Sequence, residues 1–498
     1  MTASEVSIGR DRALSSTFAW AALAAIVYAM TWQDALHGTD WRWFVLWLDE
    51  AGAVHAQHPG YLVVARGLRT LLAPLGADAY GVLRVLSILG GAVTVAGIHR
   101  IAAVVNGEAR AARHAAAVAI VSPALWHHAT VIELHAAFAA VMVWAGLTMV
   151  HWLRTGGARW AVATGAFTGV ATVMHATGHM LVPAVFATLV WRGRERGMRW
   201  VLGAAVWFAI VHTAVWGGLF ATIRTCGHLP QSVLGMAAQF DATAMPANPL
   251  EYLLHWAEGM ELATQFWPTT LHEWLQPFAP LSVAVLIAMF VSGTRAAALL
   301  LHLVLLVYLL ATVALVHAWT DERGAYLLPF LVPGILIAMR SVPRRWWLVL
   351  FAVTVACGAA FRGEPGREPP DRAFGQAAVA MARERPTRFF VADFPEMDGA
   401  FLADPNLDLR VARKEYDDLL AIQQEVRFEP TPEQITAWLS MLHRQARQAG
   451  ARFVITDRAV AWMTDRAPRF AAAWPMFLQL SGAERLAASA GIAGYAAD

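Results

Sequence analysis

The chain has 498 residues, of which 58% are hydrophobic and 15% are charged, and its formal net charge is +2. Because a water-soluble protein carries about 25% charged residues, this composition indicates a membrane protein. It excludes a soluble enzyme, a disordered chain and a disulfide scaffold, and a net charge of +2 offers no basic surface for a nucleic acid.

The charged residues are concentrated near the C-terminus. Residues 362–498 contain 36 of the 74 Asp, Glu, Lys and Arg residues, which gives this segment the charge content of an ordinary soluble domain. We therefore predict a membrane-embedded body at 1–361, a linker rich in Pro, Gly and Arg at 362–387, and an extracytoplasmic soluble domain at 388–498.

The membrane body is predicted to be a polytopic α-helical bundle. A helix needs about 20 apolar residues to cross the hydrocarbon, and fewer where the bilayer thins or the helix ends are anchored. Scanning with that length gives eleven approximate spans, at 15–32, 80–103, 112–126, 132–152, 160–176, 179–192, 199–221, 279–293, 297–316, 325–340 and 346–361.

The arginines give the orientation, because positively charged loops stay on the cytoplasmic side of the membrane. With the N-terminus inside, every second loop carries arginines, as in the Arg192, Arg194, Arg196 and Arg199 group and in Arg340, Arg344 and Arg345. An odd number of crossings then places the C-terminal domain outside. The predicted location is the cytoplasmic (inner) membrane, with the soluble domain on its periplasmic or extracellular face.

Two long outer loops are predicted, at about 33–79 and 222–278. In the first, Trp41, Phe44, Trp47 and Leu48 recur at helical spacing, which predicts an interfacial helix with its indoles at headgroup level. A second apolar stretch at 61–75 is either another interfacial helix or a shallow re-entrant one. The loop at 222–278 mixes tryptophan with glutamate and is either a lid or a passive interfacial segment, the latter being the simpler interpretation.

The C-terminal segment alternates helices and strands. Strands are predicted at 388–392 and 452–456, with a helix at 432–449 between them and a further helix after the second strand. Such alternation indicates a small α/β domain. We find no Gly-rich phosphate loop in it, so it is interpreted as an accessory or partner-binding domain.

Ionisable residues gather on the predicted outer side of the body in four clusters. Because an ionisable group at a membrane helix end costs several kcal/mol unless it is paired or hydrated, such groups are functional candidates, although interfacial solvation explains most of them. The clusters are Asp49 and Glu50 with His58-Pro59-Gly60-Tyr61; the segment 126–135, with His127, His128, Glu133 and His135; His175 with His179; and His317 with Asp321, Glu322 and Arg323.

These motifs resemble those of the membrane glycosyltransferases of the GT-C fold. The resemblance consists of an acidic residue after the first membrane helix, an HP-x-Y element opening a short helix, and an acidic residue after the third crossing. It is nearest to the bacterial protein-O-mannosyltransferase-like members, which include aminoarabinose transferases. The family often has HPP where this chain has His58-Pro59-Gly60, and often tyrosine in place of His135.

The resemblance implies transfer of a sugar, a hexose or a pentose, from a polyprenyl-phosphate donor to a lipid, glycan or protein acceptor by an inverting reaction. A carboxylate general base takes the proton of the acceptor hydroxyl. Asp49 is the first choice, while Asp40 and Glu133 stay open. Glu133 could instead orient the acceptor or bind a divalent cation, the one cofactor left open, and Glu50 belongs to the same catalytic group.

Arginine suits a departing lipid phosphate because its planar guanidinium group can donate hydrogen bonds to two phosphate oxygens at once. Arg323 is the best placed, with Arg84 and Arg66 behind it. The other predicted donor-binding or substrate-binding side chains are His58, Tyr61, His128, His135, His175 and His179.

Several histidines have a spacing or a depth that allows more than one role. His175 and His179, four apart, could ligate a metal, but a third ligand would have to come from elsewhere, so a phosphate-facing or hydrogen-bonded pair is favoured and no metal site is assigned. His99, His212 and His302 lie deeper in apolar helices and are interpreted as packed, hydrogen-bonded imidazoles. The alternatives to an enzyme are a transporter or lipid flippase, which would bind substrate at the midplane between repeats, and a scaffold that recruits partners through its C-terminal domain.

Overall fold

A computed structural model describes most of the chain outside the segment 228–330. The described residues are 3–33, 40–50, 52–54, 58–175, 178–179, 181–227, 279–281, 325, 328, 331–363, 369–392, 394–404, 406–412, 415–416, 419, 430–467, 469–487 and 491–498. The chain divides into two compact units, the first comprising residues 1–33 and 37–364 and the second running from Pro365 to Asp498.

The first unit is helical throughout its described part. Its elements are α1 (Ala3–Met30), α2 (Asp40–Asp49), α3 (Pro59–Leu72), the 3-10 turn η1 (Ala73–Leu75), α4 (Ala79–Asn106), α5 (Ala109–Val121), α6 (Pro123–His128), α7 (His135–Thr155), α8 (Ala158–Met174), α9 (Leu181–Arg196), α10 (Met198–Cys226), α16 (Leu331–Ser341), η8 (Arg344–Trp346) and α17 (Trp347–Gly363).

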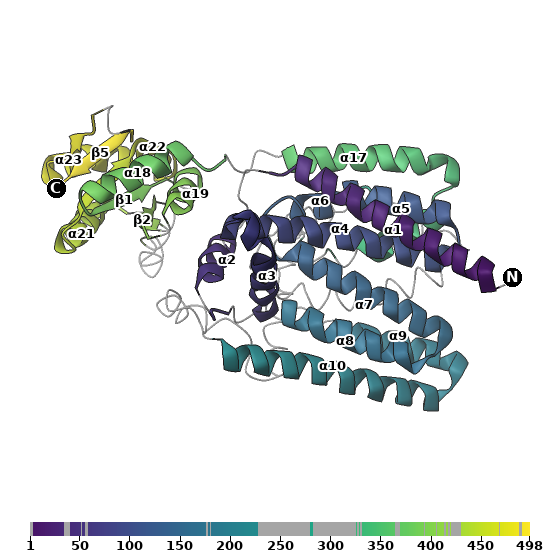
Figure 1. Cartoon of the computed structure of the whole chain (residues 1–498). Helices are drawn as coiled ribbons and strands as arrows, with labels where there is room; N and C mark the ends of the chain where they lie inside the picture. The colour runs from purple at the N-terminus through teal and green to yellow at the C-terminus, as the bar shows by residue number, and fades with distance from the viewer. Residues whose placement is uncertain are drawn as a thin grey trace. The chain divides into compact units, whose positions relative to one another are not determined.

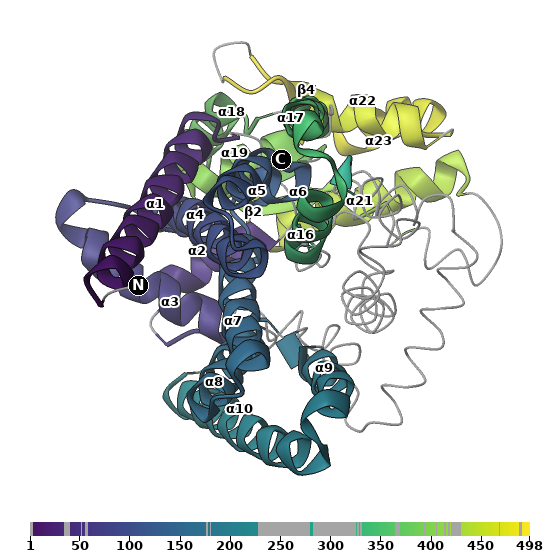
Figure 2. The same ribbon diagram turned by 90° about the vertical axis from the view of Figure 1, so that its right-hand side faces the viewer.

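The long helices form a row. α1 packs on α4, α4 on α7, α7 on α8 and α8 on α10, and they run side by side in Figure 1. α5, α6 and α17 pack on one another at the α4 end of this row, and α9 packs on α10 at the other end, as Figure 2 shows. α2 and α3 lie beside one end of the helices of this row, with α3 in contact with α4, α8 and α10.

Small residues allow the helices of the row to approach closely. A Cβ added at Gly90 of α4 would lie 2.5 Å from the backbone nitrogen of Ala137 in α7, so any larger residue there would push α4 and α7 apart. Apolar side chains gain little from association inside lipid, and membrane helices therefore associate through such close backbone contacts and through polar bonds between helices.

Buried histidines provide those polar bonds. His99 of α4 hydrogen-bonds the hydroxyls of Ser16 (3.3 Å) and Thr17 (3.1 Å) on α1, and His212 of α10 lies 3.2 Å from the hydroxyl of Thr168 on α8. The interpretation of these two residues as packed, hydrogen-bonded imidazoles is confirmed. His302 lies outside the described residues.

The described helices agree with the predicted layout. Each predicted span from 15 to 221 overlaps described helix, with 112–126 divided between α5 and α6. The described part of 325–340 contains nearly all of α16, and 346–361 lies in η8 and α17. The spans 297–316 and nearly all of 279–293 lie outside the described residues. Within the described part, four helices are long and apolar enough to cross a membrane, Ala79–Asn106, His135–Thr155, Met198–Ile223 and Arg344–Arg362, and Ser15–Met30 is a shorter apolar helix. The count of eleven crossings stays a prediction.

The two helices predicted in the first outer loop are present as α2 and α3. The aromatic face of α2 is turned inward, however: Trp41 and Phe44 are fully buried, and Trp47 and Leu48 expose at most 4% of their surface. α2 packs this aromatic face against α3 and α4, so the aromatic side chains contact protein. The predicted depth of the indoles at headgroup level stays a prediction. Amphipathic spacing gives the existence of a buried face but does not say whether lipid or protein covers it.

The second unit is an α/β domain around a mixed sheet. Its helices are α18 (Arg372–Glu384), α19 (Phe394–Ala403), α21 (Pro432–Gln448), α22 (Asp457–Arg466) and α23 (Phe470–Ser481). Its strands are β1 (Thr387–Val391), β2 (Asp408–Val411), β3 (Arg452–Thr456), β4 (Glu484–Arg485) and β5 (Gly494–Ala497), in the order β2-β1-β3-β5-β4. β2, β1 and β3 are parallel, and β5 runs antiparallel to β3 and β4.

Alternate residues of the central strands fill two hydrophobic layers. Phe389 and Val391 pack with Phe374 of α18 on one face. Phe390 packs on the other face with Phe453 and with the apolar sides of α21, α22 and α23. The period of two that successive strand side chains follow thus places a helical layer on each face, as the alternation of elements predicted.

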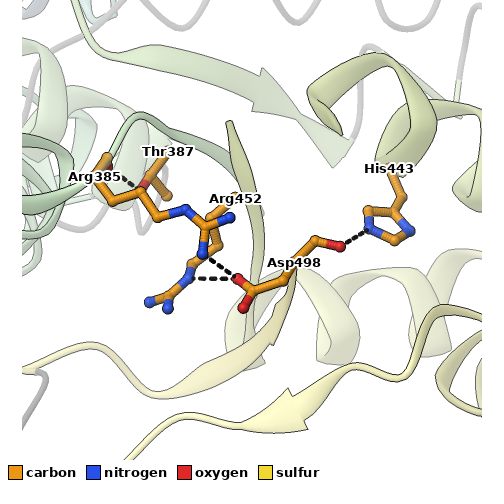
Figure 3. Close-up of polar contacts among 5 residues, drawn as sticks. All are labelled: Arg385, Thr387, His443, Arg452 and Asp498. Carbon is orange, nitrogen blue, oxygen red and sulfur yellow. Dashed lines mark hydrogen bonds and ion pairs between the residues drawn. The ribbon is translucent and has the colours of Figure 1, made fainter. Parts of the chain in front are cut away.

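The last described strand is anchored by Asp498, the residue that follows β5. The side-chain carboxylate of Asp498 accepts hydrogen bonds from Arg385 (2.8 Å) and Arg452 (3.1 Å), and its main-chain oxygen lies 3.2 Å from Nε2 of His443. Figure 3 shows the two guanidinium groups converging on this carboxylate from the starts of β1 and β3. The two arginines lower the pKa of Asp498.

Candidate active site

The structure brings together histidines from three of the predicted clusters. His58 precedes α3, His127 and His128 end α6, His135 begins α7 just after Glu133, and His175 directly follows α8. Each of these six side chains exposes at most 5% of its surface. We refer to this set, His58, His127, His128, Glu133, His135 and His175, as the histidine–glutamate cluster.

The rings of the cluster form a continuous series. His58 stacks on His175 with ring centroids 4.4 Å apart, and His175 lies 5.4 Å from His135. His135 in turn contacts His128 at 5.6 Å, and His128 contacts His127 at 5.0 Å. The start of α3, the end of α6, the start of α7 and the end of α8 therefore meet at one buried site.

The carboxylate of the cluster lies beside this series. Oε2 of Glu133 is 4.0 Å from Nε2 of His135. The backbone of Glu133 is held by Ser87 of α4, whose hydroxyl donates to the carbonyl oxygen of Glu133 at 3.2 Å. The 4.0 Å separation between Glu133 and His135 exceeds direct hydrogen-bond distance, and carboxylate and imidazole are both side chains that serve in general acid–base chemistry.

Local sequence explains how His58 and His175 come into contact. Pro59 occupies the first turn of α3, where its missing N–H costs nothing, and His58 is the residue before the helix. A Cβ added at Gly60 would lie 3.0 Å from Cγ1 and 3.1 Å from the carbonyl oxygen of Val173 in α8. Glycine at this position therefore lets the start of α3 approach the end of α8, where His175 lies.

Tyr61 borders the cluster from α3. It is fully buried, and its ring lies 4.7 Å from that of Phe44 on α2. Burial, and after it the negative charge of Glu133, raise the pKa of Tyr61. In the described part of the chain the Tyr61 hydroxyl has no hydrogen-bond partner, and a neutral phenol is able to donate a hydrogen bond.

The acidic pair of the first outer loop has different surroundings. Asp49 has 57% of its side chain exposed, and its one ion pair within the described residues is with Arg69. The guanidinium of Arg66 donates to the backbone carbonyls of Trp47 (2.7 Å), Glu50 (3.0 Å) and Ala53 (2.5 Å). Arg66 therefore holds the end of α2 and the turn that carries Glu50.

The remaining predicted site residues lie outside the histidine series. The guanidinium of Arg84 lies over the ring of Trp32, 4.5 Å from its centroid. His179 contacts Trp216 and His212 of α10, at 4.9 and 6.3 Å between ring centroids. Arg323 lies outside the described residues, so the structure does not test its predicted contact with phosphate.

The sequence analysis did not single out Ser87 or Phe138. Phe138 of α7 lies 5.1 Å from the ring of His175 and closes the apolar side of the cluster. Ser87 could have been noticed as a hydroxyl within a long apolar helix, where such groups bond across helices, whereas Phe138 gives no signal among the many apolar residues of α7.

No group of three or more His, Cys, Asp or Glu side chains in the described part of the chain has a geometry that could hold a metal ion. The side chains of the cluster are capable of hydrogen bonding and proton exchange. Its imidazoles can donate to anionic oxygens, and Glu133 can accept a proton. The divalent cation that the sequence left open stays a prediction.

Two solved structures share this fold with TM-scores above 0.5. An oligosaccharyltransferase from Archaeoglobus fulgidus, in complex with Zn and sulfate, has 13% identity and a TM-score of 0.51, over 77% of this chain and 61% of that one. The archaeal oligosaccharyltransferase AglB from Archaeoglobus fulgidus, in complex with an inhibitory peptide and a dolichol-phosphate, has 12% identity and a TM-score of 0.51, over 97% and 74%.

A third structure, ArnT from Cupriavidus metallidurans bound to undecaprenyl phosphate, has 14% identity and a TM-score of 0.49, over 97% of this chain and 98% of that one. No protein-family model and no curated protein matches the chain. The fold is that of the GT-C membrane glycosyltransferases, as the motifs predicted. Together with the four apolar helices of spanning length, this identifies a multi-pass membrane protein.

Proposed function

We propose that the chain is a glycosyltransferase that moves a sugar from a polyprenyl-phosphate donor to an acceptor on the outer side of the cytoplasmic membrane. The observation that carries the proposal is the histidine–glutamate cluster, a buried carboxylate in series with five imidazoles, within a GT-C fold. The acceptor is a lipid, a glycan or a protein, and the sugar is a hexose or a pentose.

The proposed reaction is a single displacement with inversion at the anomeric carbon. The acceptor oxygen forms a bond to C1 of the sugar while the bond from C1 to the phosphate oxygen breaks, and the proton of the acceptor hydroxyl passes to a carboxylate. The polyprenyl phosphate leaves with the bonding electrons. A base positioned within hydrogen-bond reach typically contributes 10²–10⁴-fold to such a step.

Glu133 is the carboxylate that the geometry favours as base. It is buried beside His135, whereas Asp49 is more than half exposed and paired with Arg69. Burial removes the water that competes with an acceptor hydroxyl, and His135 can receive the proton from Glu133. Asp49, the first choice from sequence, stays the alternative base, and Glu50 would act as its neighbour.

The donor phosphate needs positive charge or hydrogen-bond donors. His58, His128 and His175 are candidates because imidazole N–H groups donate to phosphate oxygens, with the Tyr61 hydroxyl beside them. Arg84 and Arg323 are the proposed guanidinium contacts, and His179 is a more distant one. The AglB structure of the same fold, which is in complex with a dolichol-phosphate, supports a polyprenyl phosphate as partner.

The proposal is tested by transfer from a radiolabelled polyprenyl-phosphate sugar in membranes that contain wild-type protein, Glu133→Gln, Asp49→Asn or Glu108→Gln. Glu108 is the matched control, because it is an exposed carboxylate that pairs with Arg344. We expect Glu133→Gln to lose at least 100-fold of the transfer rate and Glu108→Gln to retain it. Full transfer by both Glu133→Gln and Asp49→Asn would contradict the proposal.

A product with the anomeric configuration of the donor would contradict the inverting mechanism. It would leave the glycosyltransferase assignment itself standing. The configuration of the transferred sugar is read by nuclear magnetic resonance of the purified product.

A further inference from the structure

One helix of the second unit has an outer face without charge. The exposed residues of α23 fall in two adjacent rows four residues apart along the helix: Ala471, Pro475 and Gln479, and Ala472, Met476 and Leu480. Leu480 exposes 71% of its surface and Met476 exposes 37%. The opposite side of the helix, with Phe470 and Phe477, is buried in the domain core. α23 therefore has no charged residue on either side, and Gln479 is the polar residue of its outer face.

The other long helices of the unit have the charged outer faces that water requires. Exposed residues include Arg372 and Arg383 on α18, Arg444 and Arg447 on α21, and Arg458 and Asp465 on α22. The absence of charge on α23 is therefore a local property and does not reflect the composition of the domain. On a domain that the chain holds close to a membrane, an uncharged helix face with exposed apolar side chains is suited to contact with lipid.

We propose that the outer face of α23 docks on the surface of the lipid bilayer. An amphipathic helix lying in the interface presents an apolar face to the acyl chains and basic residues to the headgroups. Arg469 is the residue before α23, Arg466 ends α22, and both are exposed. Guanidinium groups at this end of the helix would meet the anionic headgroups, each contributing about 1 kcal/mol near the surface.

The short connection between α17 and α18 favours the bilayer as the partner of the outer face of α23. Only residues 364–371 separate α17, which lies within a candidate membrane span, from the start of α18. A fully extended chain covers at most about 3.3–3.6 Å per residue, so this connection reaches about 30 Å at most. The second unit therefore stays near the membrane surface, and the tether keeps the effective concentration of lipid around it high.

The area of the face argues against a second copy of the chain. A helix of 12 residues is about 18 Å long and about 10 Å wide, which gives a face on the order of 200 Å². A stable protein interface buries about 800 Å² on each partner. A tethered domain needs much less area to rest on lipid, because the connection to α17 removes most of the entropic cost of association.

The test uses full-length protein in vesicles of phosphatidylethanolamine and phosphatidylglycerol. Cys226 and Cys357 are replaced by serine, and an environment-sensitive fluorophore is attached at Met476→Cys. The matched control carries the fluorophore at Arg383→Cys, on the exposed side of α18. Nitroxide placed on the shallow part of the acyl chains measures contact with lipid, and iodide measures contact with water.

We expect lipid nitroxide to quench the α23 label at least threefold more than the α18 label, and iodide to quench it less. Adding Leu480→Glu to the Met476→Cys protein should remove most of the lipid quenching, because it places a charge on the docked face. Equal quenching at the two positions would overturn the proposal. Protection from iodide without quenching by lipid would also overturn it, by showing that protein covers the face.

Discussion

The glycine of the His58-Pro59-Gly60 element gives the sharpest test of the site geometry. Replacing Gly60 with alanine adds a Cβ at 3.0–3.2 Å from Cγ1, the carbonyl oxygen and the carbonyl carbon of Val173. Ordinary contacts begin at about 3.4 Å, and two of these three atoms are backbone. The start of α3 must then move away from the end of α8 by a few tenths of an ångström, taking His58 away from His175.

Overpacking of this kind costs about 1–3 kcal/mol. Gly67, on the same helix, is the matched control, because a Cβ added there has no atom within 4 Å. Alanine in a helix interior is more favourable than glycine by about 0.5–1 kcal/mol, so Gly67→Ala should be neutral or stabilising. The melting temperature of the purified protein in detergent, followed by tryptophan fluorescence, is the measurement.

We expect Gly60→Ala to melt several degrees below the wild type and Gly67→Ala to melt at or above it. Transfer activity should fall in Gly60→Ala alone, because only that variant separates the stacked rings of His58 and His175. Equal melting temperatures for the two variants would show that α3 and α8 are farther apart than the structure places them.

Two further predictions concern Arg66 and Glu396. Arg66→Ala removes the guanidinium that donates to three carbonyls at the end of α2, and should lower the free energy of unfolding by about 1–2 kcal/mol after allowance for solvent. We expect proteolysis between α2 and α3 to be faster in Arg66→Ala than in Arg66→Lys. Equal cleavage of the two variants would contradict this prediction. Burial raises the pKa of Glu396, so its stabilising contribution is present below its unfolded pKa and is lost as pH rises through the folded value. Between pH 4 and 8, hydrogen-exchange protection of β1 and β3 should therefore fall in the wild type relative to Glu396→Gln. A difference in protection between the two proteins that stays constant with pH would contradict the raised pKa of Glu396.

The long apolar helices of the first unit could be predicted from composition, because hydropathy over about 20 residues reflects the same transfer free energy that inserts a helix. The breaks were harder to predict. The span predicted at 112–126 is two elements, since Ser122 interrupts it with extended backbone and Pro123 starts α6. β2 and β5 went unpredicted because strands of four residues carry too little pattern to be recognised.

For the site, sequence predicted the residue types but not their partners. His58, His128, His135 and His175 were chosen because all fall near helix ends on one predicted side, and they meet in the structure. Asp49 was chosen on the same ground, yet it lies against Arg69. Which face of α2 carries Asp49 depends on how α2 packs on α3 and α4, and a single sequence does not contain that information.

Mass spectrometry of envelope lipids, glycans and proteins tests the central claim most directly. The comparison is between a strain lacking this chain and the same strain expressing wild-type protein or Glu133→Gln. The proposed transfer predicts one missing hexose, pentose or amino-sugar in the deletion strain, restored by the wild type and not by the variant. Envelopes identical in all three strains, or restoration by Glu133→Gln equal to that by the wild type, would contradict a sugar transfer that depends on the buried carboxylate.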